Sequence, residues 1–400
     1  MDRDGLLTTG YASIAHALSH MFVLFYATVV LVLEAEFALP YADLMVLSVP
    51  GAILFGAGAL PAGWLADRWS SAGMIAIFFF GTGAASIATG FADTPLRLAL
   101  GLSAIGLFAS IYHPVGIPWL IKHARNRGRA LGISGVFGSF GTAGAALVAG
   151  WLSEGMGWQA AFIAPGLFSI LLGIAFLATL RAGWIVEREG DAADAPAPAG
   201  MNRRNALLAL AVAVICTGLI YQATSYALPK MFEERLFDFA GGSIAQIGLM
   251  VTACYVVSGL TQLIGGELAD RYEEKWVYAA AQVLQVPIYV VGYQLFGPGL
   301  LGVAVLMIGL NVIGQPAENA LVARYTPPRW RGQAFGAKFV LTLGVSAVGI
   351  AVLPVIHEAF GSFDPLWLML AATAALGFLA AAILPANRPR RGKVSIAAAE

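Results

Sequence analysis

Charged side chains are scarce in this sequence. Lys, Arg, Asp and Glu together make up 12% of its 400 residues, and hydrophobic residues make up 59%. Soluble proteins carry about 25% charged and roughly 45–50% apolar residues, so a set of soluble domains is excluded. Apolar runs of about 18 residues or more recur along the chain, and each is long enough to cross a bilayer core of about 30 Å. The sequence therefore predicts an all-α, multi-pass membrane protein.

Other features are rare or missing, and each excludes a class of protein. Cysteine occurs only as Cys216 and Cys254, both inside apolar runs, so no disulfide framework is predicted. No Gly-rich phosphate-binding loop ends in Lys-Ser or Lys-Thr, so ATP-driven transport by this chain has no support. The sequence also shows no nucleophile–base pair and no metal site completed by a carboxylate. We therefore expect neither an enzyme nor a cofactor, and no nucleic-acid partner.

Polar and Gly/Pro clusters divide the apolar sequence into twelve candidate transmembrane helices. The segment 181–204 is charged and rich in Ala and Pro, and it separates six spans from six. We therefore expect an N-terminal six-helix bundle over residues 1–180, a flexible cytoplasmic linker over 181–204, and a C-terminal bundle over 205–400 that ends in a basic cytoplasmic tail. The predicted spans are approximately 10–33, 43–66, 73–91, 96–121, 129–152, 158–180, 205–228, 243–268, 276–296, 299–323, 332–356 and 363–385.

The positive charges predict the orientation. If the N-terminus is cytoplasmic, that side holds all of the 23 Lys and Arg residues except Arg97, Lys230, Arg235 and the intrahelical Lys338. Cytoplasmic loops of membrane proteins carry such an excess of Lys and Arg. We therefore expect both termini in the cytoplasm and a location in the cell inner membrane.

The opposite side carries an acidic cluster of Glu34, Glu36 and Asp43. We interpret this cluster as a solvated loop, because positive charge is concentrated on the other side. A cation antechamber is the alternative.

The two halves of the chain repeat one another. The sequence GWLADRW at 63–69 recurs as GELADRY at 266–272. A second repeat, at nearly the same offset, relates the segment that begins at His113, HPVGIPWLIKHARNRGRALG, to the one that begins at Gln315, QPAENALVARYTPPRWRGQAFG. Two pairs of similar segments, each separated by nearly the same number of residues, indicate that one half of the chain is a duplicate of the other. We expect two six-helix bundles related by a pseudo-two-fold axis along the membrane normal, with a substrate path between them.

These repeated segments resemble the major facilitator superfamily over essentially the full length of the chain. The resemblance implies a secondary transporter that works by alternating access, with a small-molecule substrate, and we expect a monomer in the bilayer. The residues that match the loop signature of that family are Gly63, Leu65, Ala66, Asp67, Arg68, Gly266, Leu268, Ala269, Asp270 and Arg271.

Within the superfamily, HALSHMF at 16–22 and IYHPVG at 111–116 look like the fosmidomycin-resistance branch of drug exporters. That likeness implies efflux by proton antiport.

The aspartates of the loop signature are expected to act in gating. Asp67, flanked by Arg68, can cap a neighbouring helix N-terminus and pair with a basic loop. Such a contact exists only when the cytoplasmic helix ends are together, so it biases one access state. Asp270 and Arg271 hold the same place in the second half. The alternative is that each Asp-Arg pair anchors a helix end at the headgroups.

Three histidines lie inside predicted spans, where ionisable side chains are costly and indicate function. At about 1.5 Å per residue, His16, His20 and His113 reach one level of the bilayer, provided that the first and fourth spans are neighbours. Tyr112 precedes His113, and Pro114 removes a helical hydrogen bond and loosens a carbonyl there. We expect these residues to face the translocation path, where an imidazole with a pKa near 6.5 can exchange protons. A structural histidine bonded between helices is the alternative.

The second half supplies the other candidate pathway residues. Asn311, Gln315 and either Glu318 or Asn319 follow one stripe at helical spacing. Gln315 takes the place of the first-half histidine. Lys338 falls at a similar depth to Glu318, so the two side chains can form an ion pair. The role of such a pair is either functional or structural. Tyr221 and Tyr255 add donors to the predicted cavity wall, which we place on spans 1, 4, 7 and 10.

Small residues recur at every third position in the fifth span, at Gly135, Gly138, Gly141 and Gly144. A stripe of this kind lets two membrane helices pack closely.

A proton-coupled exporter of a small organic compound or drug is the function that this sequence favours. The alternative is a transporter of a metal ion or metal chelate, with His16 and His20 at positions i and i+4 and His113 as ligands. No nearby Cys, Asp or Met cluster completes such a site, so no metal centre is assigned from the sequence.

Overall fold

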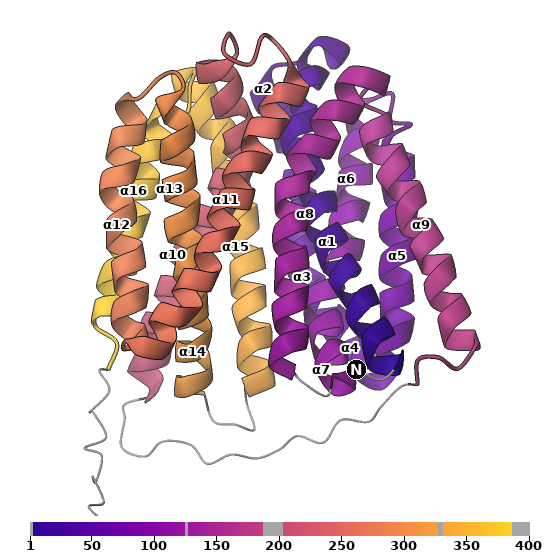
Figure 1. Ribbon diagram of the computed structural model, residues 1–400. Coiled ribbons are helices and arrows are strands. Elements are labelled where there is room, and N and C mark those ends of the chain that lie inside the picture. Colours follow the sequence, from indigo (N-terminus) through magenta and orange to yellow (C-terminus); the bar gives the residue numbers. More distant parts are fainter. Residues whose placement is uncertain (1–2, 125–126, 187–202, 327–330, 386–400) are drawn as a thin grey trace, which may run out of the picture.

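The computed structural model describes residues 3–124, 127–186, 203–326 and 331–385, and every regular element within these ranges is a helix. Figure 1 shows the helices running side by side in two groups, which follow the first and second halves of the chain. Eleven of the described helical spans are long and apolar enough to cross a membrane. The expected all-α membrane architecture is thus confirmed.

The first group holds six spans, of which two are made of several consecutive helices. Four spans are single helices, namely α1 (Arg3–Phe37), α5 (Ser71–Thr89), α8 (Arg127–Met156) and α9 (Ala160–Arg181). The second span joins α2 (Tyr41–Val46), α3 (Val49–Ala57) and α4 (Ala59–Arg68), and the fourth joins α6 (Pro95–Ala109), the π-helix η1 (Tyr112–Gly116) and α7 (Ile117–His123).

The second group also holds six spans, of which one is made of two consecutive helices. Its spans are α10 (Arg203–Leu236), α11 (Ile244–Arg271), α12 (Glu274–Gln294), the pair α13 (Gly299–Ile313) and α14 (Gln315–Tyr325), α15 (Arg331–Phe360) and α16 (Asp364–Ala382). The chain between α9 and α10, where we expect the linker, and the expected basic tail lie largely outside the described residues, at 187–202 and 386–400.

The span at 276–296 is the least apolar of the twelve. It is a helix as expected, α12, but it is not among the eleven that meet the hydropathy requirement for a membrane span. The cause is a set of polar residues inside it, including the buried Gln282 and Gln285. Because α12 packs against α13 and α16, these amides are shielded from lipid by neighbouring helices.

Both bundles interrupt one span at the duplicated proline. In the fourth span, Pro114 lies within η1, between α6 and α7. In the tenth span, α13 ends at Ile313, Gly314 forms a turn, and Pro316 lies at the start of α14. Proline lacks the N–H that would close the helical turn and its ring clashes with the carbonyl four residues earlier, so each helix breaks at the same place in its repeat.

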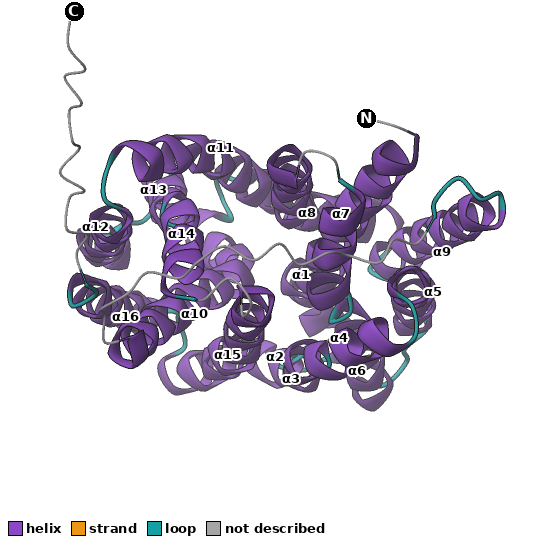
Figure 2. Cartoon of the chain, turned by 90° about the horizontal axis from the view of Figure 1, so that it is seen from below, coloured by secondary structure: helices purple, strands orange, loops and turns teal. Residues whose placement is uncertain are grey.

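The two bundles meet along paired helices. α8 packs against α11, α15 against α2 and α3, and α1 against α10; Figure 2 shows the first two of these contacts at opposite edges of the molecule. We call the end at which α1 begins the terminus side and the opposite end, at which α1 ends, the far side. The α8–α11 contact relies on small residues, since a Cβ on Gly248 would lie 2.3 Å from the carbonyl oxygen of Ala146.

Candidate functional site

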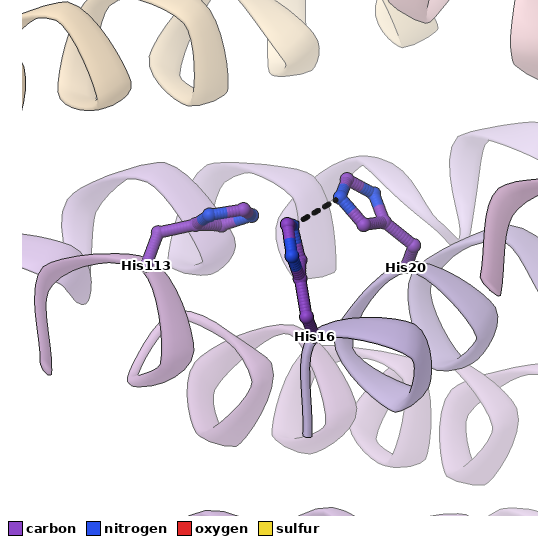
Figure 3. A group of neighbouring side chains, drawn as sticks. All are labelled: His16, His20 and His113. Atoms are coloured by element: carbon purple, nitrogen blue, oxygen red, sulfur yellow. Dashed lines mark hydrogen bonds between the residues drawn. The ribbon is translucent and has the colours of Figure 1, made fainter. Parts of the chain in front are cut away.

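The structure brings the three predicted intramembrane histidines together (Figure 3). Helix α1 places His16 and His20 one turn apart, and η1 of the fourth span places His113 beside them. The ring centroids lie 5.1 Å apart for His16 and His20, 5.3 Å for His16 and His113, and 5.4 Å for His20 and His113. One ring nitrogen of each lies within 4.8 Å of the others. We call these residues the histidine triad.

Hydrogen bonds define the orientation of the first two rings. Nδ1 of His16 lies 2.8 Å from the carbonyl oxygen of Ser134 on α8, and a carbonyl can only accept, so Nδ1 carries a hydrogen. In a neutral imidazole the other nitrogen is then an acceptor. Nε2 of His20 lies 3.3 Å from Nε2 of His16, so His20 donates to it when both rings are neutral. Tyr112 supports this arrangement, because its ring stacks on His16 at 4.8 Å and its hydroxyl lies 3.0 Å from Ser134 Oγ.

His113 is the member of the triad that touches the other bundle. Its ring stacks on Phe339 of α15, with centroids 5.0 Å apart and an interplanar angle of 18°. The side chain is only 5% exposed, and neither ring nitrogen has a hydrogen-bond partner among the described residues. The imidazole of His113 is therefore buried at the contact between the two halves with its polar atoms unused.

In the second half, Glu318 and Lys338 form an ion pair, which the sequence suggested without deciding its role. Lys338 Nζ lies 2.6 Å from Glu318 Oε1, and the two side chains are 10% and 2% exposed. Lys338 also donates to Asn319 Oδ1 at 2.5 Å. The other carboxylate oxygen of Glu318 accepts from the Tyr278 hydroxyl at 2.8 Å. The pair joins α14 to α15, and Lys338 is the immediate neighbour of Phe339, which stacks on His113.

A chain of polar side chains continues from Glu318 into the interior of the second bundle, and sequence reasoning missed it. Tyr278 lies 2.7 Å from Thr217 Oγ1, which also accepts from Gln282 at 2.5 Å. Gln285 donates to Gln282 at 3.3 Å and accepts from Tyr289 at 2.9 Å. The signal was available, because Tyr278, Gln282, Gln285 and Tyr289 are spaced by four, three and four residues and so form one helical stripe in an apolar run.

The remaining predicted pathway residues lie in the second bundle or at its edge. Asn311 donates to the Thr217 carbonyl at 3.4 Å, Gln315 accepts from Gln262 at 3.1 Å, and Tyr255 lies 2.6 Å from Ser225 Oγ. The Tyr221 hydroxyl lies 3.0 Å from Thr142 Oγ1 of α8 and so joins the two halves. Of the predicted residues, the structure brings together the histidine triad with Tyr112 in the first bundle and the Glu318–Lys338 pair in the second, while Gln315, Tyr255 and Tyr221 bond to other side chains.

A small cavity lies between the halves. It is displaced from the histidine triad towards the far side of the molecule. Its volume is about 30 Å³, room for one or two water molecules. An organic substrate does not fit in a volume of this size. Phe55, one of its lining residues, also contacts the His113 ring with centroids 6.4 Å apart. The cavity is lined by Phe22, Val23, Tyr26, Ser48, Gly51, Ala52, Phe55, Leu102, Ile105, Gly106, Gln222, Tyr226 and Ile350.

The acidic cluster on the far side is not simply a solvated loop. Glu36 and Asp43 are exposed as expected, but Glu34 pairs with Lys230 of the other half at 2.7 Å and accepts from the Tyr41 backbone at 3.1 Å. Lys230 also pairs with Glu233 at 2.7 Å. The interpretation of Glu34 as a free solvated carboxylate was wrong, because its partner lies 196 residues away in sequence and no local pattern reveals it.

The predicted gating residues lie on the terminus side. Asp67 and Asp270 are exposed. The Arg68 guanidinium lies over the Trp64 ring at 4.4 Å, and Arg271 pairs with Glu267 one turn earlier. The side chains of the basic segments that the two aspartates would contact, 125–129 and 327–331, lie outside the described part of the structure. The gating role stays a prediction.

Two helical bundles that bury ionisable side chains at bilayer depth, close to the surface along which they meet, define a membrane transporter. The sequence profile of the Major Facilitator Superfamily matches this chain at residues 12–242 and again at 210–399. The chain belongs to that superfamily.

Among its relatives, the chain is 26% identical to the 4-hydroxybenzoate transporter of Pseudomonas putida, in an alignment that covers 72% of this chain and 71% of that one. It is 23% identical to an uncharacterised transporter of the same superfamily from Bacillus subtilis, covering 75% of this chain and 74% of that one.

The fold is similar to that of solved transporters. A bacterial homologue of the human lysosomal transporter Spinster, in an inward-facing and unoccupied conformation, matches with a TM-score of 0.76 at 14% identity, covering 94% of this chain and 97% of that one. A D-xylose–proton symporter matches with a TM-score of 0.72 at 13% identity, covering 95% and 97%. At these identities the likeness concerns the fold.

Proposed function

We propose that this protein exports a small organic compound across the cell inner membrane by alternating access, in exchange for protons. It acts as a monomer with both termini in the cytoplasm. The 4-hydroxybenzoate transporter and the D-xylose–proton symporter support a small organic substrate by their names. The export direction rests on the likeness of HALSHMF and IYHPVG to the fosmidomycin-resistance branch.

The Glu318–Lys338 ion pair is the observation that best supports coupling of transport to protons. When Glu318 takes a proton, Lys338 loses its counter-ion, and an unpaired buried charge costs several kcal/mol. Among the described residues, the ammonium group keeps only its bond to Asn319, and its need for water or an anion favours a movement of α15 relative to α14. Because Lys338 precedes Phe339, that motion changes the stacking of Phe339 on His113 and hence the contact between the halves. Protonation of one carboxylate thus biases the access state.

The histidine triad is the alternative binding site for the coupled proton, and it is the site that the sequence favours. Its His16–His20 hydrogen bond can hold a proton, but it involves two residues of one helix and so does not by itself join moving parts.

The test uses purified protein in liposomes with a pH-sensitive dye inside, and 4-hydroxybenzoate as the first substrate probe. Wild-type protein should couple the probe to proton movement, whereas Glu318→Gln should retain exchange of labelled for unlabelled probe but lose accumulation driven by a pH gradient. Glu267→Gln is the matched control, because Glu267 pairs with Arg271 on an exposed helix end. Full gradient-driven accumulation by Glu318→Gln would show that the coupling proton is held elsewhere, and His113→Gln would then be tested in the same assay.

A further inference from the structure

Two members of the histidine triad have the spacing of ligands in a metal site, and the third has a ring nitrogen within 4.8 Å of theirs. In a tetrahedral site with metal–nitrogen distances of about 2.0–2.1 Å, two nitrogen ligands lie about 3.3–3.4 Å apart. The Nε2 atoms of His16 and His20 are 3.3 Å apart. Two imidazoles at positions i and i+4 of α1 are therefore already spaced as neighbouring ligands of one ion, which binds once His20 carries its hydrogen on Nδ1 and no longer donates from Nε2 to His16.

The surroundings of His16 orient it as a ligand. Histidines that bind metals almost always donate their second ring N–H to a carbonyl, a carboxylate or water, which fixes the tautomer. His16 donates from Nδ1 to the Ser134 carbonyl at 2.8 Å, so its Nε2 lone pair points towards His20. The hydroxyl of Ser134 in turn lies 3.0 Å from that of Tyr112, which holds this segment of α8 in place.

His113 supplies an independent observation that points to a ligand. Its two ring nitrogens are buried and have no partner among the described residues, and a buried polar group left without a hydrogen bond costs about 1–3 kcal/mol. The ring is placed by the π-helix η1, and single-turn π-bulges occur frequently at functional sites. A bound ion would use the lone pair of one of these nitrogens and so reduce this cost.

We propose that His16, His20 and His113 bind one divalent transition-metal ion, with a fourth coordination position left for an anionic ligand. Imidazole ligands suit Zn²⁺, Cu²⁺ and Ni²⁺. The described side chains of the cluster include no carboxylate, so three neutral imidazoles leave the charge of the ion uncompensated within the membrane. The fourth ligand is therefore an anion, and the acid group of an organic substrate fits this position; only this last point rests on the proposed function.

The site lies where a bound ion affects both bundles. His16 and His20 belong to α1, and His113 stacks on Phe339 of α15 in the second half. To reach the ion, the His113 ring must turn on Phe339, so occupancy of the site and the contact between the halves depend on one another.

The test measures metal binding by purified protein that carries no polyhistidine tag. After removal of metals with a chelator, Co²⁺ is titrated into the detergent-solubilised protein, and tetrahedral coordination is followed by its visible absorption. Zn²⁺ affinity is measured by competition with a chromophoric chelator. We expect one equivalent per chain, and at least a tenfold loss of affinity in His20→Gln and in His113→Gln.

His123→Gln is the matched control, since the His123 ring is buried in the same bundle but is bonded to the carbonyls of Trp119 and Val186. It should bind like wild type. If the triad variants do not fold, Zn²⁺ should still raise the unfolding temperature of the wild-type protein. Absence of stoichiometric binding, or binding that both triad variants retain, would overturn the proposal. Because no transport is measured, these results are independent of whether 4-hydroxybenzoate is carried.

Discussion

Glu318 has both carboxylate oxygens engaged, one by Lys338 and the other by Tyr278. A carboxylate at this depth is tolerated because each oxygen has a partner, and Lys338 is tolerated for the same reason. The two residues therefore stabilise the bundle only as a pair, and the effect of changing one depends on whether the other is still present.

This dependence can be measured in a double-mutant cycle. Lys338→Met should lower the free energy of unfolding by about 3–5 kcal/mol, because it leaves Glu318 buried without a counter-ion. The double variant Glu318→Gln, Lys338→Met should recover most of that loss, because no charge remains. Thermal unfolding in detergent measures both. Losses that simply add would show that the residues do not interact.

The histidines illustrate what single residues in a sequence do and do not reveal. Their depth and their separation by four positions predicted that His16 and His20 share a level with His113, and the structure brings them together. The donation from His16 to the Ser134 carbonyl and the stacking of His113 on Phe339 involve residues more than a hundred positions away in the chain. Periodicity carries no information about such partners, so the tautomer and the contact between halves could not be predicted.

At the scale of whole helices, the sequence predicted all twelve spans because each combines an apolar run with flanking turn residues. The largest discrepancy is α10, expected to end near residue 228 but continuing to Leu236. The extension carries Lys230 and Arg235, which a hydropathy argument assigns to solvent. The structure instead pairs Lys230 with Glu34 and Arg235 with Asp364 at 2.5 Å, so distant partners allow the helix to continue.

The role of each glycine in the α8 stripe depends on what it faces on the neighbouring helices. A Cβ on Gly141 would lie 2.1 Å from the carbonyl oxygen of Ala17 on α1, whereas a Cβ on Gly144 meets nothing within 4 Å. Only part of the evenly spaced stripe therefore supports close packing with α1. Spacing alone does not distinguish these glycines from one another.

These two glycines provide a matched pair of variants. Gly141→Ala should destabilise the first bundle by about 1–3 kcal/mol, because α8 must move away from α1. Gly144→Ala should be neutral or stabilise by about 0.5–1 kcal/mol, since alanine loses less backbone entropy in a helix. Unfolding temperatures measured side by side check this, and equal effects would show that the α1–α8 contact is looser than described.

For the molecule as a whole, the far side holds a set of contacts that join the halves. Glu34 pairs with Lys230, the ring of Tyr41 in the first half lies 5.0 Å from that of His357 in the second, and the Tyr226 hydroxyl donates to the Val23 carbonyl. The first two contacts lie beyond the small cavity, and Val23 and Tyr226 are part of its lining, so all three must break if the cavity is to open to that side.

Lys230→Met should therefore favour opening towards the far side. Ser48 is buried and lines the cavity, so a cysteine introduced there reports access. We expect Ser48→Cys to react faster with a membrane-impermeant maleimide when Lys230→Met is also present. The unmodified protein is the control, because Cys216 and Cys254 are buried. Equal labelling rates with and without Lys230→Met would show that this ion pair does not hold the far side closed.

The paired interruptions at Pro114 and Pro316 have a consequence for the history of the molecule. Duplication gave both halves the same break in the same span, and the residue before each proline, His113 in one copy and Gln315 in the other, has since taken a different chemistry. Both copies retain the break, as a π-helix at Pro114 and as a turn before Pro316. An imidazole stands at this place in one half and an uncharged amide in the other, so the two-fold symmetry of the scaffold does not extend to its chemistry.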